Sequence, residues 1–290
     1  MAFTSASFPA ELVKDVFIGA KGHSSIAKLC GMTPIAFSGT DVMTFSLDGE
    51  VNLVGEGDAK ASHTNSNDAV HIIPRKIEYG ARVSDEFLRC SEEKQLDYIK
   101  AFSEGFEKKI GRGIDIMAMH GTNPKTGSPA TTLIGTNSFD TNTGVTSVTY
   151  TSSDPEANIT SAIAAIGDYE LNGVAMSKTF AAALAGLKVN GVPQYPELGW
   201  GANVASIKGV PVDVNSTVSA DVKKFAYAGD FANAFKWGYA DKINFEVIEY
   251  GDPDNSGADL KGHNQVYLRA EAWVGWAILD AGAFARIETP

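Results

Sequence analysis

The feature that most constrains this chain is a long, regular apolar pattern between Ser91 and His120. Apolar residues recur there at every third or fourth position, namely Leu96, Ile99, Phe102, Phe106, Ile110, Ile114 and Met117. This spacing predicts an α-helix with one apolar face and with Lys108 directed toward solvent. Ser91 is a favourable N-cap residue, and Gly121 follows the last turn. At about 1.5 Å per residue the helix is roughly 45 Å long, so it must pack against another layer.

A long polar segment lies between two predicted strands ahead of this helix. Asp41–Leu47 and Arg75–Ser84 alternate between apolar and polar residues, which is typical of half-buried strands. In the second strand the residues expected to share one face are Ile77, Tyr79, Ala81 and Val83. The intervening Asp48–Ala69 has few core-forming residues and is too long for an ordinary hairpin turn. It is either disordered or a functional projection that something else orders.

The second half of the chain predicts a mixed α and β region followed by a last pair of strands. One helix is capped by Asp154, and another is capped by Ser177 and closed by Asn190-Gly191. The predicted strands are Val174–Met176, Ile207–Val214, Phe225–Ala228, Phe245–Tyr250 and Val266–Ile278. In the last strand Trp273 and Trp276 face opposite sides, and both sides therefore need cover. The end of the chain is expected to be buried.

Charge and composition exclude several classes of protein. The chain has 24 Lys and Arg against 35 Asp and Glu, a net charge of −11, and no basic run of the kind that nucleic-acid wrapping needs. Cys30 and Cys90 are far apart and are predicted to be buried thiols. No stretch reaches the run of about 18 apolar residues that a membrane span requires, and the N-terminus lacks a signal-peptide pattern. We expect an intracellular, soluble protein.

A search for catalytic and metal-binding patterns yields no site. The five histidines show no metal-ligand spacing and are interpreted as isolated surface or capping residues, and no serine lies in a nucleophile-elbow motif. Asp252–Gly257 resembles the first half of a calcium-binding loop, but the twelfth position is His263 where a glutamate is needed. We interpret this segment as a hairpin loop. No catalytic residue, cofactor or metal site is predicted.

Several short segments, in order along the chain, carry a resemblance to a known family. They are Val54–Gly57, Pro74–Ile77, Val83–Leu88, Met176–Thr179, Lys208–Val212, Gly229–Phe231 and Ala281–Ile287. Their order and spacing resemble the Hong Kong 97-type major capsid proteins of tailed bacteriophages. The resemblance implies an α+β fold with an N-terminal arm (1–37), an extended E-loop hairpin (38–80), a P-domain (81–153 and 241–290) with a spine helix at about 91–120, and an A-domain (154–240).

The resemblance also implies a function and a set of partners. Copies of the chain are expected to form hexamers and pentamers of an icosahedral head that encloses double-stranded DNA without sequence-specific binding. Residues Val54, Gly55, Glu56, Gly57 and Lys60 are expected to contact a neighbouring subunit. Portal, scaffolding or decoration proteins are the expected partners, with assembly in the host cytoplasm. Because Met1 lies shortly before the arm, we expect a separate scaffolding protein or none.

One further implication is covalent, and two other functions compete with the shell. In the founding member of the family an E-loop lysine bonds to an asparagine of a neighbour with the help of a glutamate, and Lys60, Asn264 and Glu271 have similar places here. The first alternative function is an encapsulin-like compartment of the same fold. The second is a calcium- or carbohydrate-binding enzyme, suggested by the loop at Asp252 and the tryptophans.

Overall fold

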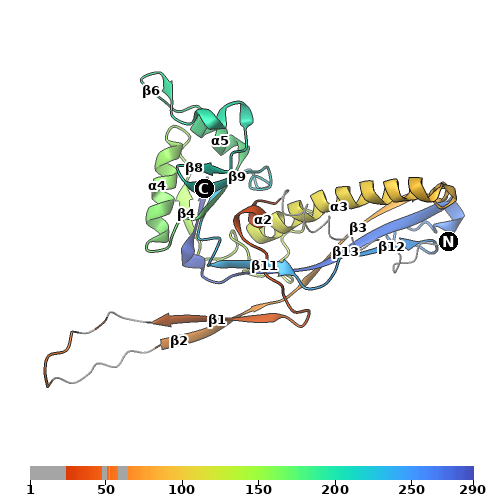
Figure 1. Cartoon of the computed structure of the whole chain (residues 1–290), viewed down its shortest axis with the longest axis horizontal. Coiled ribbons are helices and arrows are strands. Elements are labelled where there is room, and N and C mark those ends of the chain that lie inside the picture. The colour runs from red at the N-terminus through yellow and green to blue at the C-terminus, as the bar shows by residue number, and fades with distance from the viewer. Residues whose placement is uncertain (1–23, 48–50, 52, 58–64) are drawn as a thin grey trace.

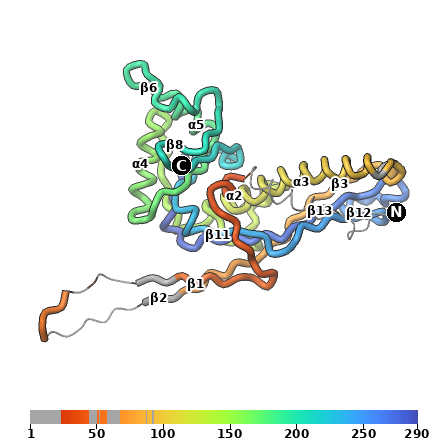
Figure 2. The backbone as a smooth tube through the Cα atoms, viewed as in Figure 1, coloured from red at the N-terminus to blue at the C-terminus, as the bar shows by residue number. Residues whose placement is uncertain are grey.

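The computed structural model describes residues 24–47, 51, 53–57 and 65–290. Figure 1 shows an elongated body along a long helix, an α/β region at one end of that body, and a two-stranded ribbon that projects away from both. Figure 2 traces the same path and shows the ribbon leaving the body beside β11. Of the predicted arm, residues 1–23 lie outside the described part of the chain.

The body is an antiparallel sheet of four strands. Its long central strand, β13 (Gln265–Ile278), pairs along one edge with β3 (Arg75–Ser84). Along the other edge it pairs with β12 (Asn244–Ile248) and then with β11 (Phe235–Tyr239). The predictions of strands at 75–84, 245–250 and 266–278 are thereby confirmed to within two residues.

One face of this sheet is covered by α3 (Glu92–His120), a single continuous helix. Phe106 is buried on its sheet-facing side and Lys108 is exposed, as the apolar spacing predicts. Gly121 ends the helix in the left-handed conformation, where glycine is favoured, and its N–H donates to the Met117 carbonyl. The prediction for Leu96 is wrong, because its side chain is 40% exposed. Gln95 is buried instead, and its amide donates to backbone carbonyls of the segment ahead of the helix.

The α/β region is built on a mixed sheet of six strands. Their order is β4 (Thr146–Thr149), β14 (Phe284–Glu288), β10 (Lys224–Gly229), β5 (Gly173–Met176), β9 (Val210–Val214) and β8 (Ser206–Ile207). Two helices pack on it, α4 (Pro155–Ile166) and α5 (Lys178–Ala185). The predicted caps are confirmed: the Asp154 carboxylate accepts from the Ala157 N–H, and the Ser177 hydroxyl accepts from the Phe180 N–H. As expected, the last strand is buried inside a sheet.

The predicted end of the second helix is wrong. Helix α5 stops at Ala185, and Asn190-Gly191 instead forms the turn of a small hairpin, β6 (Lys188–Val189) and β7 (Val192–Pro193). Asn190 and Gly191 have φ angles of 51° and 82°, which a two-residue hairpin turn of this type requires. The short 3-10 helices in the described residues are η2 (Asp85–Arg89), η3 (Pro196–Gly201), η4 (Lys261–His263) and η5 (Ala281–Ala283).

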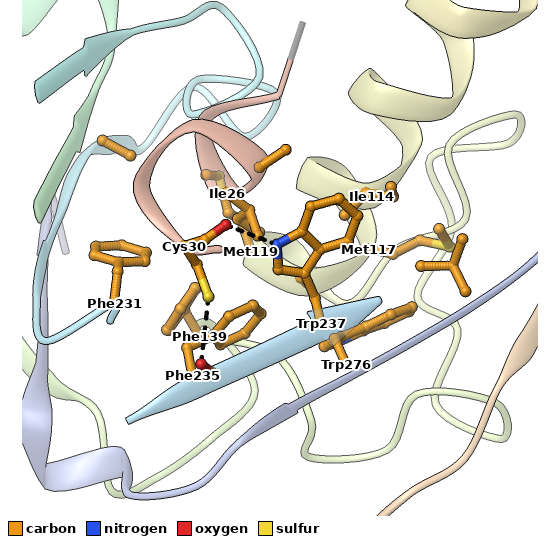
Figure 3. Close-up of a cluster of buried hydrophobic side chains, with 14 of the residues drawn as sticks. Ile26, Cys30, Ile114, Met117, Met119, Phe139, Phe231, Phe235, Trp237 and Trp276 are labelled. Carbon is orange, nitrogen blue, oxygen red and sulfur yellow. Dashed lines mark hydrogen bonds between the residues drawn. The ribbon is translucent and has the colours of Figure 1, made fainter. Parts of the chain in front are cut away.

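The main core lies where the body, the α/β region and the short helix α2 (Ser25–Leu29) meet, as Figure 3 shows. The Trp237 indole N–H donates to the Cys30 carbonyl at 3.0 Å, and the Cys30 thiol lies 3.3 Å from the Phe235 carbonyl. Burial raises the pKa of the Cys30 thiol to about 12, so the thiol stays neutral. The prediction that Cys90 is also buried is wrong, because that residue is exposed just ahead of α3.

Candidate assembly surfaces

The projecting ribbon consists of β1 (Thr40–Leu47) and β2 (Asn65–Ile72), paired antiparallel from Thr40↔Ile72 to Leu47↔Asn65. Among the described strands, neither pairs with any other. Arg75–Ser84, the second of the two strands predicted around the polar segment, therefore does not pair with β1. That strand belongs to the body, and the strand that pairs with β1 begins inside the segment interpreted as a polar excursion. The excursion is accordingly shorter than the sequence suggested.

The root of the ribbon is anchored in the body. Ile72 is fully buried and packs with Ile35 and Ala277 in a small apolar cluster. Segment 33–35 lies along β11, with the Thr33 N–H donating to the Trp237 carbonyl at 2.9 Å. A side chain at Gly238 would collide with the Thr33 carbonyl, so glycine is needed for this close approach. In the described residues, the ribbon is thus held at its root.

The described part of the ribbon tip is apolar and open to solvent. Val51 and Leu53 are 95% and 98% exposed, and Val54 and Met43 are exposed as well. The residues expected at the inter-subunit contact, Val54, Gly55, Glu56 and Gly57, all lie in this exposed stretch. Lys60, the fifth of them, lies outside the described residues. Exposed aliphatic side chains at the end of an uncovered ribbon indicate a surface that another molecule covers.

The two other residues of the expected covalent bond do not lie together in one subunit. Asn264 precedes β13 in a left-handed turn, whereas Glu271 lies seven positions along that strand, a separation of about 20 Å. The Glu271 carboxylate is 2.6 Å from the Lys76 ammonium and 3.3 Å from the Arg269 guanidinium. It therefore serves as the centre of an ion-pair group on the sheet face opposite α3.

On the same face the guanidinium of Arg82 occupies the loop that resembles a calcium site. One of its nitrogens, Nη2, donates to the Asp252 carboxylate at 2.7 Å, the Ser256 hydroxyl at 2.6 Å and the Ala258 carbonyl at 2.8 Å, and it also contacts Asp254. The Arg82 hydrogen bond holds the pKa of Asp254 well below its usual value. The interpretation as a hairpin loop between β12 and β13 is confirmed. The Arg82 guanidinium thus supplies the positive charge inside this loop.

Two buried carboxylates hold the start of α2, one from the long helix α3 and one from the α/β sheet. Asp115 of α3 is fully buried and accepts from the Ser24 hydroxyl, the Ser25 and Ile26 N–H groups and the Thr217 hydroxyl. Asp213 of β9 accepts from the Ser25 hydroxyl at 2.6 Å and the Lys28 ammonium at 2.9 Å. The chain that leads into the ribbon is therefore held against the spine helix and the α/β sheet together.

The Asp115 carboxyl is electrostatically unusual. Burial raises its pKa to about 6, although the four donors named above act in the opposite direction. For Asp213, whose partners include the Lys28 ammonium, the pKa is lowered despite the opposing effect of burial. The two carboxylates therefore respond differently to mild acid.

One histidine departs from the expectation of surface or capping positions. His120 is buried at the end of α3, with Nε2 donating to the Thr217 carbonyl at 2.9 Å and Nδ1 2.8 Å from the Asp140 carboxylate. The Tyr227 hydroxyl donates to the same carboxylate at 2.9 Å. This polar group joins the spine helix to strand β10. We assign this group a structural role, because it is buried between α3 and β10.

Two features are absent from the part of the chain that the structure describes. No helix there is long and apolar enough to cross a bilayer. Among the same residues, no group of three or more His, Cys, Asp or Glu side chains could hold a metal ion.

Comparison with known proteins identifies the family. A family model described as the phage capsid family matches residues 7–289. The chain belongs to the phage capsid family. A comparison of this capsid protein with curated protein sequences found no match.

Solved structures agree with this assignment. A chain from Mycobacterium phage Ogopogo is 30% identical, with a TM-score of 0.77 and 92% of each chain covered. A chain from Gordonia phage Cozz is 25% identical, with a TM-score of 0.74 and coverage of 92% of this chain and 87% of that one. The capsid of a native GTA particle shares the fold at 15% identity, with a TM-score of 0.65 and coverage of 93% and 90%. The expected α+β, Hong Kong 97-type fold and the role of structural major capsid protein are confirmed.

Proposed function

We propose that copies of this capsid protein assemble into hexamers and pentamers of an icosahedral phage head that encloses double-stranded DNA. The observation that carries the proposal is the ribbon β1–β2, which among the described residues is anchored at its root and carries exposed apolar side chains at its tip. An isolated two-stranded ribbon is marginally stable in water, and ordering it costs conformational entropy. Laid across a neighbouring copy, it gains the packing that its own subunit does not supply.

The remaining features fit a passive container. With a net charge of −11 the chain is suited to enclosing DNA without binding it tightly. Each subunit meets several neighbours in a closed shell, so modest contacts suffice. We infer that the protein works without catalysis, assembles in the host cytoplasm, and meets portal, scaffolding or decoration proteins there.

The alternatives are less well supported. An encapsulin-like compartment has the same fold, but the similarity at 30% identity is to a phage protein. A calcium-binding enzyme would need an open loop at Asp252, where Arg82 already supplies the positive charge.

The proposal is tested by replacing Gly55–His63 with a short turn. The variant should unfold in urea at the same midpoint as the natural chain, because the described part of this segment lies outside the core. It should fail to form shells in negative-stain electron microscopy. Normal shells from this variant would refute the role given to the ribbon tip.

The covalent bond between subunits stays a prediction. The Lys60 amine would attack the Asn264 side-chain carbon, forming a C–N bond and releasing ammonia, with Glu271 accepting the proton from the amine. Because Asn264 and Glu271 are about 20 Å apart along one chain, they would come from different copies. Denaturing gel electrophoresis of boiled shells tests this. A ladder of multimers that Lys60→Ala abolishes supports the bond, and a single band at the subunit mass rules it out.

A further inference from the structure

An exposed tryptophan marks a surface on the α/β region that the ribbon does not explain. Of the four tryptophans, Trp237 and Trp276 are buried and Trp273 is half-buried, whereas Trp200 is fully exposed. Its backbone is left-handed, with φ 61° and ψ 21°, a conformation that is sterically unfavourable for a residue with a side chain. Folding within one chain gives this residue no compensating burial.

A hollow lies beside Trp200. It has a volume of about 400 Å³ and lies between α5 and η3, and its mostly apolar lining includes Ala182, Ala185, Leu198, Trp200 and Val214 together with Lys178. Cavities of about 150 Å³ hold a benzene molecule, so this hollow has room for more than one aliphatic side chain. The alanines on α5 leave the space open, and the indole forms part of its wall.

A projection of matching chemistry lies on the same region. In the hairpin β6–β7, Val189 and Val192 are directly paired, so their side chains lie next to each other on one face. They are 57% and 62% exposed, so they do not enter the hollow of their own chain. Figure 1 shows β6 at the outer end of the α/β region, away from α3. The hairpin is well formed, with the Gln194 N–H donating to the Leu187 carbonyl at its base.

We propose that the hairpin β6–β7 of one copy docks into the hollow beside Trp200 of the next copy. The contact joins two different patches, and such head-to-tail contacts close into rings when they repeat. A second copy is the favoured occupant because the chain carries both halves of the contact and leaves both exposed. This inference rests on the proposed assembly into hexamers and pentamers, for which it names one interface.

Crosslinking between two singly substituted chains tests the pairing directly. Val189→Cys and Ala182→Cys are made separately on a Cys90→Ser background, because Cys90 is exposed and Cys30 is buried. The two variants are mixed, assembled and oxidised, so that any disulfide between the two positions joins different subunits. We expect a band of twice the subunit mass. Val222→Cys mixed with Ala182→Cys is the matched control, since Val222 is a valine that is even more exposed than Val189, and it should give no such band.

Tryptophan fluorescence provides the second measurement. Acrylamide quenching of the natural chain minus that of Trp200→Phe isolates the Trp200 signal, which should become several-fold less accessible on assembly. Trp200→Ala should fold normally and raise the concentration needed for assembly about ten-fold or more, because a buried aromatic anchor is lost. Trp200→Phe should assemble nearly as well as the natural chain.

The outcomes separate this inference from the proposed function. Shells in which Trp200 is quenched as easily as in free subunits would overturn the docking while leaving the assembly intact. Disulfides formed only between identical positions would also overturn it, in favour of a two-fold contact. Protection of Trp200 only when another phage protein is added would assign the hollow to that protein. Failure of the natural chain to assemble under any condition would instead remove the proposed function.

Discussion

At the scale of single residues, the packing of α3 on the sheet is best tested at Phe106 and Lys108, which lie two positions apart on the same helix. Phe106 is buried and its ring lies 6.0 Å from that of Phe245. Phe106→Ala should lower the free energy of unfolding by about 3–5 kcal/mol, because it removes a large buried side chain and leaves a cavity. Lys108→Ala should change it little. Urea titrations measure both, and equal losses would contradict this packing.

The buried carboxyl of Asp115 predicts a dependence of stability on pH. Its pKa is about 6 in the folded chain and 3.8 in the absence of structure, so the folded state binds more protons between these values. Its contribution is therefore fully present below pH 4 and is lost as the pH rises through 6, by on the order of 3 kcal/mol.

Asp115→Asn is the matched variant, because asparagine does not titrate. It should be less stable overall, since its amide N–H₂ meets hydrogen-bond donors. The difference in unfolding free energy between the natural chain and the variant should shrink from pH 4 to pH 7 in urea titrations. Parallel pH profiles would show that this carboxyl does not titrate in that range.

A residue's structural role can be predicted from sequence when it depends on residues close to it in the chain. The caps at Asp154 and Ser177 depend on neighbours three positions away, and both were predicted correctly. Cys90 and His120 were not, because their burial is decided by segments distant in the chain. The sequence does not single out Trp200, although the flanking Gly199 and Gly201 are a sign of unusual backbone.

At the scale of elements, the loop between β12 and β13 depends on a single side chain from β3. Arg82→Ala should leave Asp252 and Asp254 repelling each other and loosen the loop. Amide exchange at Ser256 and Gly257, whose N–H groups donate to Asp252, should accelerate. Hydrogen-exchange mass spectrometry measures this. Arg269→Ala, on the same sheet face but outside the loop, is the control, and unchanged exchange in Arg82→Ala would contradict the expectation.

Elements with one buried face were predictable, and elements without one were not. β3 and β13 alternate because α3 covers one side of their sheet, so their patterns predicted nearly the right bounds. β2 begins with Asn65-Ser66-Asn67-Asp68, in which Asn and Asp are poor strand formers and no apolar alternation indicates a strand. Of the candidate site, exposure of Val54–Gly57 follows from sequence, whereas the separation of Asn264 from Glu271 needed the register of the sheet.

At the scale of the whole molecule, the natural chain should sediment as pentamers, hexamers or closed shells, alone or with a scaffold. The physical reason is that each subunit leaves apolar surface at the ribbon tip and on the α/β region uncovered. Analytical ultracentrifugation over a range of salt and protein concentrations checks this. A sharp monomer peak under every condition would contradict it.

The route of the last residues through both sheets has a consequence for the timing of shell building. β13 is the central strand of the body, and β14, which follows it closely, lies inside the α/β sheet between β4 and β10. Neither sheet can close until residues 265–288 have left the ribosome, so the earlier strands of both sheets wait for this segment before they can pair with it. A nascent or prematurely released chain lacks the middle of both sheets and cannot present a finished surface to its neighbours. Only chains that contain residues 265–288 can then present finished surfaces to a growing shell.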